Sequence, residues 1–154
     1  MHSVLSLKHA ELTEKIIGIF FDVYNELGHG FLESVYHNAL YFALREALLE
    51  VECQVPIEVW YHGHQIGDFK VDMVVDNQVL LELKAARHID LAHEKQILNY
   101  LRATQIEVGL LLNFGAKPEF RRFVFENERK EIRVNPRQSA AKGVHQSAAD
   151  GVPA

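Results

Sequence analysis

Two different periods of hydrophobic residues follow one another along this chain. In its first third the apolar positions recur every three to four residues, a spacing typical of amphipathic helices. A glycine-rich break divides this pattern, so we expect one helix over residues 12–27 and a second over about 32–49. Thr13 is the expected N-cap of the first helix, and Gly28 its C-terminal stop.

Beyond residue 50 the apolar residues alternate with polar ones, which is the period of a β-strand. Residues 51–61 are expected to form a half-buried strand with its apolar residues on one face. Pro56 favours an edge position for this strand, because proline cannot donate to a ladder. Residues 69–75 and 79–84 follow as two further strands joined by a tight turn.

The helical period returns over residues 90–104, where Asp90 is the expected N-cap. Residues 106–114 are almost continuously apolar, as in a central strand buried on both faces. A last strand is expected over residues 120–125. The predicted order is therefore α-α-β-β-β-α-β-β, which places the chain in the α/β class with a mixed sheet.

Length and composition set the frame for these elements. A chain of 154 residues is long enough for one domain, which we place at residues 1–134. Residues 135–154 lose all apolar periodicity and are expected to form a disordered tail. No run of about 18 apolar residues occurs, so no membrane span is expected. The single Cys53 fits a reducing cytoplasm.

The charge is unevenly distributed. The net charge of −5 does not by itself indicate a nucleic-acid-binding protein. Residues 1–68 hold three basic and ten acidic residues, net −7, whereas residues 69–154 hold thirteen basic and eleven acidic residues, net +2. A polyanion would therefore meet the second half more easily than the first.

Three charged residues, Asp72, Glu82 and Lys84, interrupt strands that are otherwise built for burial. Buried charge is costly unless it is paired, hydrogen-bonded or bound to a metal ion. Glu82 and Lys84 share one strand face. A three-residue turn would pair Val75 with Val79 and bring Asp72 opposite Glu82, with Cβ atoms roughly 4.5–5.5 Å apart.

The register leaves two interpretations of this charged cluster open. A two-residue turn would place Asp72 and Glu82 on opposite faces and separate them. With the three-residue turn, the cluster is either a buried ion-pair network or a site for a hard divalent cation. Two acids and one base carry excess negative charge, which favours a missing cation.

The arrangement of these residues resembles the PD-(D/E)XK nuclease superfamily. The resemblance rests on Asp72, the run Glu82-Leu83-Lys84, and Gln96 followed four residues later by Tyr100. Residues 30–36 (GFLESVY) also match the signature of the small GxxExxY proteins within that superfamily. The resemblance covers roughly residues 10–130, and it implies a restriction-endonuclease-like core, a mixed central sheet flanked by helices.

The resemblance also implies roles for individual residues. Asp72, Glu82 and the backbone carbonyl of Leu83 would hold Mg²⁺ or Mn²⁺. Glu33 would join them as a site acid, although residue type alone favours a simple interaction with the helix dipole. Lys84 would position water or neutralise the phosphate, and Gln96 and Tyr100 would orient the substrate. The candidates for phosphate contacts are Arg87, Lys95, Arg102, Arg121 and Arg122.

The function expected from this sequence is metal-dependent hydrolysis of nucleic-acid phosphodiester bonds, with DNA favoured over RNA. The alternative is a non-catalytic nucleic-acid-binding or assembly module that retains the fold. A protein-interaction scaffold is a third hypothesis, and it would require a large exposed apolar patch. Because so small a domain covers little nucleic acid, a homodimer or a partner protein is also expected.

Overall fold

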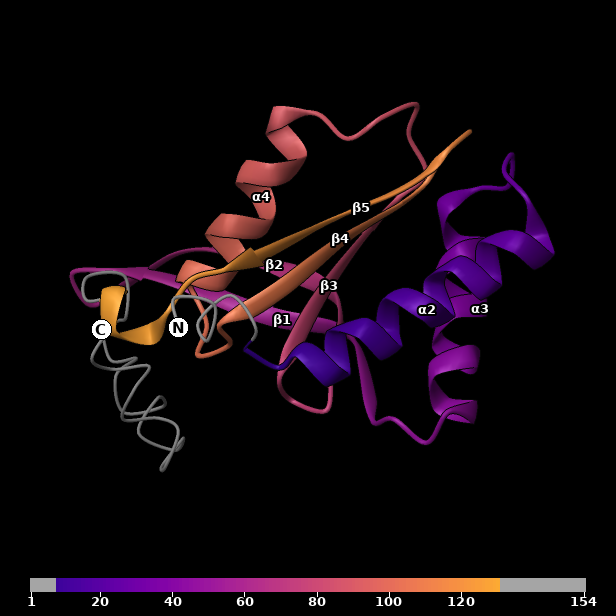
Figure 1. Cartoon of the computed structure of the whole chain (residues 1–154). Helices are drawn as coiled ribbons and strands as arrows, with labels where there is room; N and C mark the ends of the chain where they lie inside the picture. The colour runs from indigo at the N-terminus through magenta and orange to yellow at the C-terminus, as the bar shows by residue number, and fades with distance from the viewer. Residues whose placement is uncertain (1–7, 131–154) are drawn as a thin grey trace.

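The computed structural model describes residues 8–130, which form one five-stranded mixed sheet with helices on both faces (Figure 1). The predicted order of helices and strands and the fold class are confirmed. The segment expected to be a tail, residues 135–154, lies outside the described residues. The elements are α2 (Ala10–Leu27), α3 (Glu33–Glu46), β1 (Val51–Tyr61), β2 (His64–Val75), β3 (Val79–Lys84), α4 (Leu91–Arg102), β4 (Val108–Phe114), β5 (Pro118–Val124) and the short 3₁₀ helix η1 (Asn127–Arg129).

The strands lie side by side in their order along the chain, from β1 to β5. All neighbours are antiparallel except β3 and β4, which are parallel and are connected through α4. The strand with Pro56 lies at the sheet edge, as predicted. Every residue of β4 is buried, which confirms the prediction of a central strand.

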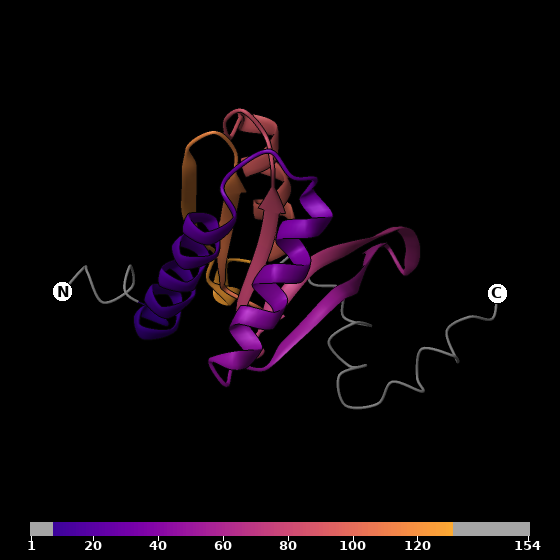
Figure 2. The same ribbon diagram turned by 90° about the vertical axis from the view of Figure 1, so that its right-hand side faces the viewer.

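The two faces of the sheet carry separate apolar cores. Figure 2 shows α2 and α3 in front of the sheet and α4 behind it. The larger core lies under α2 and α3 and includes Phe20, Leu40, Leu81 and Phe114, all nearly or fully buried. The smaller core lies under α4 and combines residues of β2, β3 and β4 with residues of α4 itself.

Strand β1 contributes to both cores, so the prediction of a single apolar face was wrong. Val51 and Cys53 pack against the core under α2 and α3, whereas Val55 and Ile57 pack against the core under α4. Between them Gln54 has a φ of 51°, a left-handed conformation. This residue lies outside the β conformation, so the period of two changes phase at this point.

The ends of the first two helices correct the predicted boundaries. Helix α2 begins at Ala10 after His9, so Thr13 is not its N-cap; the buried Thr13 hydroxyl instead donates to the Ala10 carbonyl oxygen, at 3.1 Å. Gly28 does end α2, with φ at 73° and its amide bonded to Tyr24 O. Helix α3 stops at Glu46, earlier than predicted.

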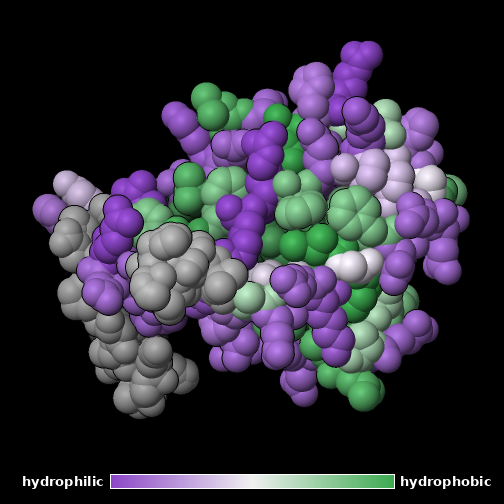
Figure 3. Space-filling view, viewed as in Figure 1, coloured by the Kyte–Doolittle hydropathy of each residue, from purple (hydrophilic) through white to green (hydrophobic). Residues whose placement is uncertain are grey.

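The outer surface is mainly hydrophilic, but apolar side chains gather on the face that Figure 3 shows, between the β5 edge of the sheet and α2. Phe120 of β5 contributes to this area with an exposed fraction of 39%, and its ring meets Phe21 of α2 edge-on at 6.1 Å. Among residues 8–130, the helices are too short or too polar to cross a lipid bilayer.

Candidate active site

The turn between β2 and β3 sets the relation between the two central carboxylates. Val75 pairs with Val79, so the loop has three residues, as the favoured register required. The antiparallel ladder then runs to Met73 and Leu81. Beyond this pair, a side-chain hydrogen bond replaces the backbone ladder. The Leu83 backbone amide donates to Asp72 Oδ2 at 2.8 Å. Asp72 and Glu82 therefore share one end of the β2–β3 hairpin.

Glu82 is the most unusual carboxylate in the described part of the chain. It lies on the α4 face of β3 with an exposed fraction of only 5%. Its Oε1 atom is buried and has no hydrogen-bond partner within residues 8–130. Burial first, and then the negative charge of Asp72, raise the pKa of Glu82 to about 8, against the opposing effect of Lys84. The empty protein therefore resists ionisation of this group.

Opposing effects also act on the pKa of Asp72. Burial raises its pKa, while the hydrogen bond from the Leu83 amide and the charges of His37 and Lys84 lower it. The two carboxylates thus repel each other, and Lys84 is the basic side chain that opposes this repulsion at both. An additional positive charge between them would relieve the strain on both groups.

Glu33 comes to this cluster from the opposite side of the sheet, as the first residue of α3. Partial burial raises its pKa first, and the negative charge of Asp72 raises it further. Lys84, His37 and His93 act in the opposite direction. Glu33 therefore both occupies the positive end of the helix dipole and shares an electrostatic environment with Asp72.

Tyr36 stabilises the loop between α2 and α3, and this loop sets the position of Glu33. Its side chain is fully buried and stacks on Phe114, with ring centroids 4.5 Å apart. The Tyr36 hydroxyl donates to the Gly28 carbonyl oxygen at 2.5 Å and accepts from the Phe31 amide at 3.3 Å. Tyr36 thus closes the turn between α2 and α3 and fixes where α3 begins.

Helix α4 presents a polar and aromatic face to the carboxylates. Gln96 Nε2 donates to the Tyr100 hydroxyl at 2.5 Å, so these two residues share one face as the spacing predicted. Tyr100 stacks on Phe69 of β2, with centroids 4.3 Å apart. Burial raises the pKa of Tyr100, and the negative charge of Glu82 raises it further.

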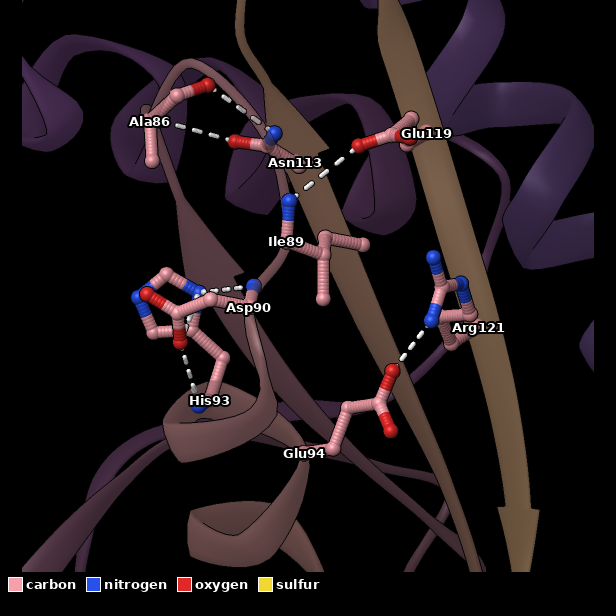
Figure 4. Close-up of polar contacts among 8 residues, drawn as sticks. All are labelled: Ala86, Ile89, Asp90, His93, Glu94, Asn113, Glu119 and Arg121. Carbon is pink, nitrogen blue, oxygen red and sulfur yellow. Dashed lines mark hydrogen bonds and ion pairs between the residues drawn. The ribbon is translucent and has the colours of Figure 1, made fainter.

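The segment from Lys84 to α4 is held by a buried amide on β4. Asn113 pairs in register with Lys84, and its side chain is fully buried. Figure 4 shows this side chain bonding both backbone groups of Ala86: Oδ1 accepts from the amide at 2.8 Å, and Nδ2 donates to the carbonyl oxygen at 3.0 Å. A Cβ atom at Gly115 would lie 2.0 Å from that carbonyl oxygen, so only glycine fits there.

Further contacts in Figure 4 fix the start of α4. Asp90 and His93 form a capping box, which confirms the predicted N-cap. The Ile89 amide donates to Glu119 Oε1 at 3.2 Å. Glu94 pairs with Arg121 of β5. Lys84, Gln96 and Tyr100 are thus set relative to one another by side chains from β4 and β5.

The five predicted phosphate contacts differ in their surroundings. Arg87 and Lys95 are exposed. Arg102 lies over the Phe125 ring. Arg121 is exposed, as predicted, and pairs with Glu94. Arg122 was expected to be exposed, but it is partly buried and donates to the Lys8 carbonyl oxygen, and burial lowers its pKa.

Sequence reasoning did not identify His37 or Asn113 as parts of this region. His37 Nε2 lies 3.4 Å from the Asp72 carbonyl oxygen and 3.5 Å from Gln54 Nε2. A signal for His37 was present, because it follows Glu33 by four residues and so shares its helix face. No local pattern marks Asn113, since its partner Ala86 is distant in the chain.

The donor set fits a hard divalent cation. The orphaned Oε1 of Glu82 and the raised pKa values of Glu82 and Asp72 are the features expected where a cation normally compensates two carboxylates. The structure brings together two side chains rather than three: within residues 8–130, no group of three or more His, Cys, Asp or Glu residues is arranged to hold a metal ion.

Comparisons with known proteins identify the family of this chain. The family model of the PD-(D/E)XK nuclease superfamily matches residues 10–123, so the chain belongs to this superfamily. No curated protein matches the chain. Among solved structures, the crystal structure of a protein named SSO0001 is similar, with 17% sequence identity and a TM-score of 0.48 over 73% of this chain. The match covers 58% of that protein's length.

Proposed function

We propose that this protein is a metal-dependent nuclease whose active site is formed by Asp72, Glu82 and Lys84. The observation that carries the proposal is the buried, unpartnered Oε1 atom of Glu82 beside a second carboxylate. A structural ion-pair network would have satisfied this atom, because an unsatisfied buried polar group is costly. Membership of a nuclease superfamily supports the same conclusion.

Asp72, Glu82 and the Leu83 carbonyl would hold Mg²⁺ or Mn²⁺, with Glu33 as an additional acid from α3. When bound, such an ion supplies Lewis-acid activation of water and compensates negative charge on the phosphate. Lys84 places its ammonium on the same strand face as Glu82, where it positions the attacking water and attracts the phosphate. Gln96 and Tyr100 orient the substrate from α4.

The GxxExxY signature has a structural explanation within this proposal. We assign the chain to that subfamily because Tyr36 closes the turn before α3, and Glu33 starts the helix at the edge of the acidic cluster. The substrate that follows from the superfamily is nucleic acid, and the proposed domain spans residues 1–134. A homodimer or partner protein would extend the small surface available for binding.

A cleavage assay tests this function directly. Single- and double-stranded DNA and RNA are incubated with Mg²⁺, Mn²⁺ or EDTA, beside the variants Glu82→Gln and Lys84→Ala. The matched controls are Asp22→Asn and Lys15→Ala, because both residues are exposed on α2. We expect metal-dependent cleavage that the first two substitutions abolish and the controls retain. Cleavage that survives Glu82→Gln would contradict the proposal.

One observation favours the non-catalytic alternative, a nucleic-acid-binding or assembly module. In the described part of the chain no metal cluster of three side chains forms. Isothermal titration with Mn²⁺ separates the two functions. Absence of both binding and cleavage would assign the protein to the binding module, whereas binding that Glu82→Gln removes would support the nuclease.

A further inference from the structure

A pocket opens between α3 and the edge strand β1, beside the proposed active site. We call it the α3–β1 pocket; its lining residues are His37, Asn38, Tyr41, Phe42, Val51 and Cys53, and its volume is about 380 Å³. This volume lies within the usual range for small-molecule sites, about 300–1,000 Å³. Figure 2 shows α3 in front of the sheet, with β1 running away from its lower end.

His37 joins this pocket to the acidic cluster. It lines the pocket, and its Nε2 atom also approaches the Asp72 carbonyl oxygen. Glu33, His37 and Tyr41 follow one another at intervals of four residues, so they form one stripe along α3. The stripe rises about 12 Å from Glu33 to Tyr41, a distance that a short extended strand of nucleic acid can span.

The pocket carries the side chains that bind a nucleobase. The rings of Tyr41 and Phe42 meet edge to face with centroids 5.2 Å apart, and Phe42 is 62% exposed and so accessible for stacking. Asn38 and His37 supply polar groups for the edge of a base. Arg45 bonds the Tyr41 hydroxyl at 3.2 Å and adds one positive charge at the far end.

The charge beyond the pocket limits how far a strand can continue. Past Arg45 the surface turns acidic, with Glu46 and Glu50 following on the chain and Glu52 on β1. A continuing polyanion would be repelled there, whereas the last base of a strand brings no further phosphate. The pocket therefore suits a strand end and not the middle of a long strand.

An added peptide strand fits this edge less well. The outer side of β1 is interrupted at Gln54, where the backbone is left-handed, and at Pro56, which has no amide proton. A regular strand could therefore pair over only a short stretch of β1. The aromatic rings are better used for stacking, which tolerates any base.

We propose that the α3–β1 pocket binds the terminal base of a single-stranded nucleic acid, placing a phosphodiester near that end at Asp72 and Glu82. This inference rests on the proposed nuclease function and narrows its substrate to strand ends. The residues that carry it are Phe42 and Tyr41 for stacking and Asn38 for the base edge.

The test is a binding measurement that does not depend on cleavage. Fluorescence polarisation follows labelled single-stranded DNA and RNA octanucleotides with the full chain carrying Lys84→Ala, in Mn²⁺. We expect Phe42→Ala to weaken binding by about five- to hundredfold, the range that one base–aromatic stack supports. Phe42→Tyr retains a ring and should restore affinity. Tyr61→Ala, which removes a 59% exposed aromatic ring elsewhere, is the matched control and should change nothing.

A covalently closed single-stranded circle of DNA tests the preference for strand ends. The linear strand should bind at least tenfold more tightly than the circle of equal composition. Equal affinities would overturn the end preference, and unchanged binding by Phe42→Ala would overturn the pocket. A third outcome would also overturn the proposal. If the protein with its natural pocket side chains binds no strand but binds an extended peptide in a Phe42-dependent way, the pocket belongs to a protein partner.

The experiments distinguish failure of the base-binding proposal from failure of the nuclease proposal. Unchanged octanucleotide binding by Phe42→Ala, together with cleavage that Lys84→Ala abolishes, removes the pocket and leaves the nuclease. Phe42-dependent binding without metal-dependent cleavage keeps the base site on a binding module.

Discussion

The sheet face under α2 and α3 and the face under α4 differ in what they bury. The first is closed by two helices over a wide apolar core in which Phe20, Tyr36 and Phe114 are packed ring to ring. The second has one helix and a smaller core, and it also contains Glu82, an ionisable group with an unpartnered oxygen.

Strand β3 contributes side chains to both faces of the sheet from alternate positions. Leu81 and Leu83 enter the larger core, whereas Leu80 and Glu82 lie under α4. One short strand can thus combine an apolar side that stabilises the fold with a charged side that destabilises the metal-free protein. The proposed chemistry therefore lies on a strand whose opposite face is already packed into the larger core.

The largest expected effect separates two positions of β3. Leu81→Ala should lower the free energy of unfolding by about 2–5 kcal/mol, because it leaves a cavity in the larger core. Lys84→Ala should change stability by less than about 1 kcal/mol and reduce cleavage by about 10²- to 10⁴-fold. Urea unfolding and initial cleavage rates measure the two quantities. Equal losses of stability in Leu81→Ala and Lys84→Ala would contradict the view that one face of β3 stabilises the fold and the other carries the chemistry.

The pH dependence of stability should come from the α4 face. The pKa of Glu82 is raised to about 8 in the folded protein from 4.5, so between these values the folded state holds a proton that the unfolded chain has lost. Stability should therefore fall as the pH rises through this window, by at most about 1.4 kcal/mol per pH unit.

Glu82→Gln should flatten this slope and raise the melting temperature of the metal-free protein at pH 8, which thermal unfolding in EDTA at several pH values would show. Mn²⁺ should stabilise the wild type increasingly as the pH rises towards 8, because the ion competes with the proton. The same slope in Glu82→Gln would show that another group is responsible.

A smaller effect is expected where β4 holds the Lys84 segment. Asn113→Leu would leave the amide and carbonyl of Ala86 without their partners, at a cost of about 2 kcal/mol. The Ala86 amide should also exchange with deuterium faster. Asn99→Leu is the comparison, since Asn99 is exposed on α4. Unchanged exchange at Ala86 in Asn113→Leu would argue against this role.

The smallest predicted effect concerns the loop before α3. Tyr36→Phe keeps the ring stacked on Phe114 but removes the hydroxyl that bonds Gly28 and Phe31. We expect a loss of about 1 kcal/mol in unfolding free energy. Tyr61→Phe, at an exposed position, should have no measurable effect in the same denaturant titration.

Local patterns were sufficient for much of this protein. The change from helical to strand period gave the element order, and the three-residue turn gave the pairing of Val75 with Val79. That pairing placed Asp72 and Glu82 at the same end of one hairpin. These features follow from the sequence because helix and strand periods are properties of neighbouring residues.

Other features depend on contacts between distant segments. The split of β1 between two cores follows from the left-handed Gln54, and no residue type in the strand signals it. The burial of Arg122, which was wrongly expected to be exposed, depends on the Lys8 backbone.

The sequence by itself determined which residues alternate, which acids share a strand end, and where α4 begins. Only the tertiary structure decided that Glu82 is buried with one oxygen unpartnered among residues 8–130, that His37 approaches the Asp72 backbone, and that Asn113 bonds Ala86. The physical reason is range: periodicity and capping act over a few neighbouring residues, whereas desolvation and hydrogen-bond satisfaction depend on whatever the folded chain brings alongside.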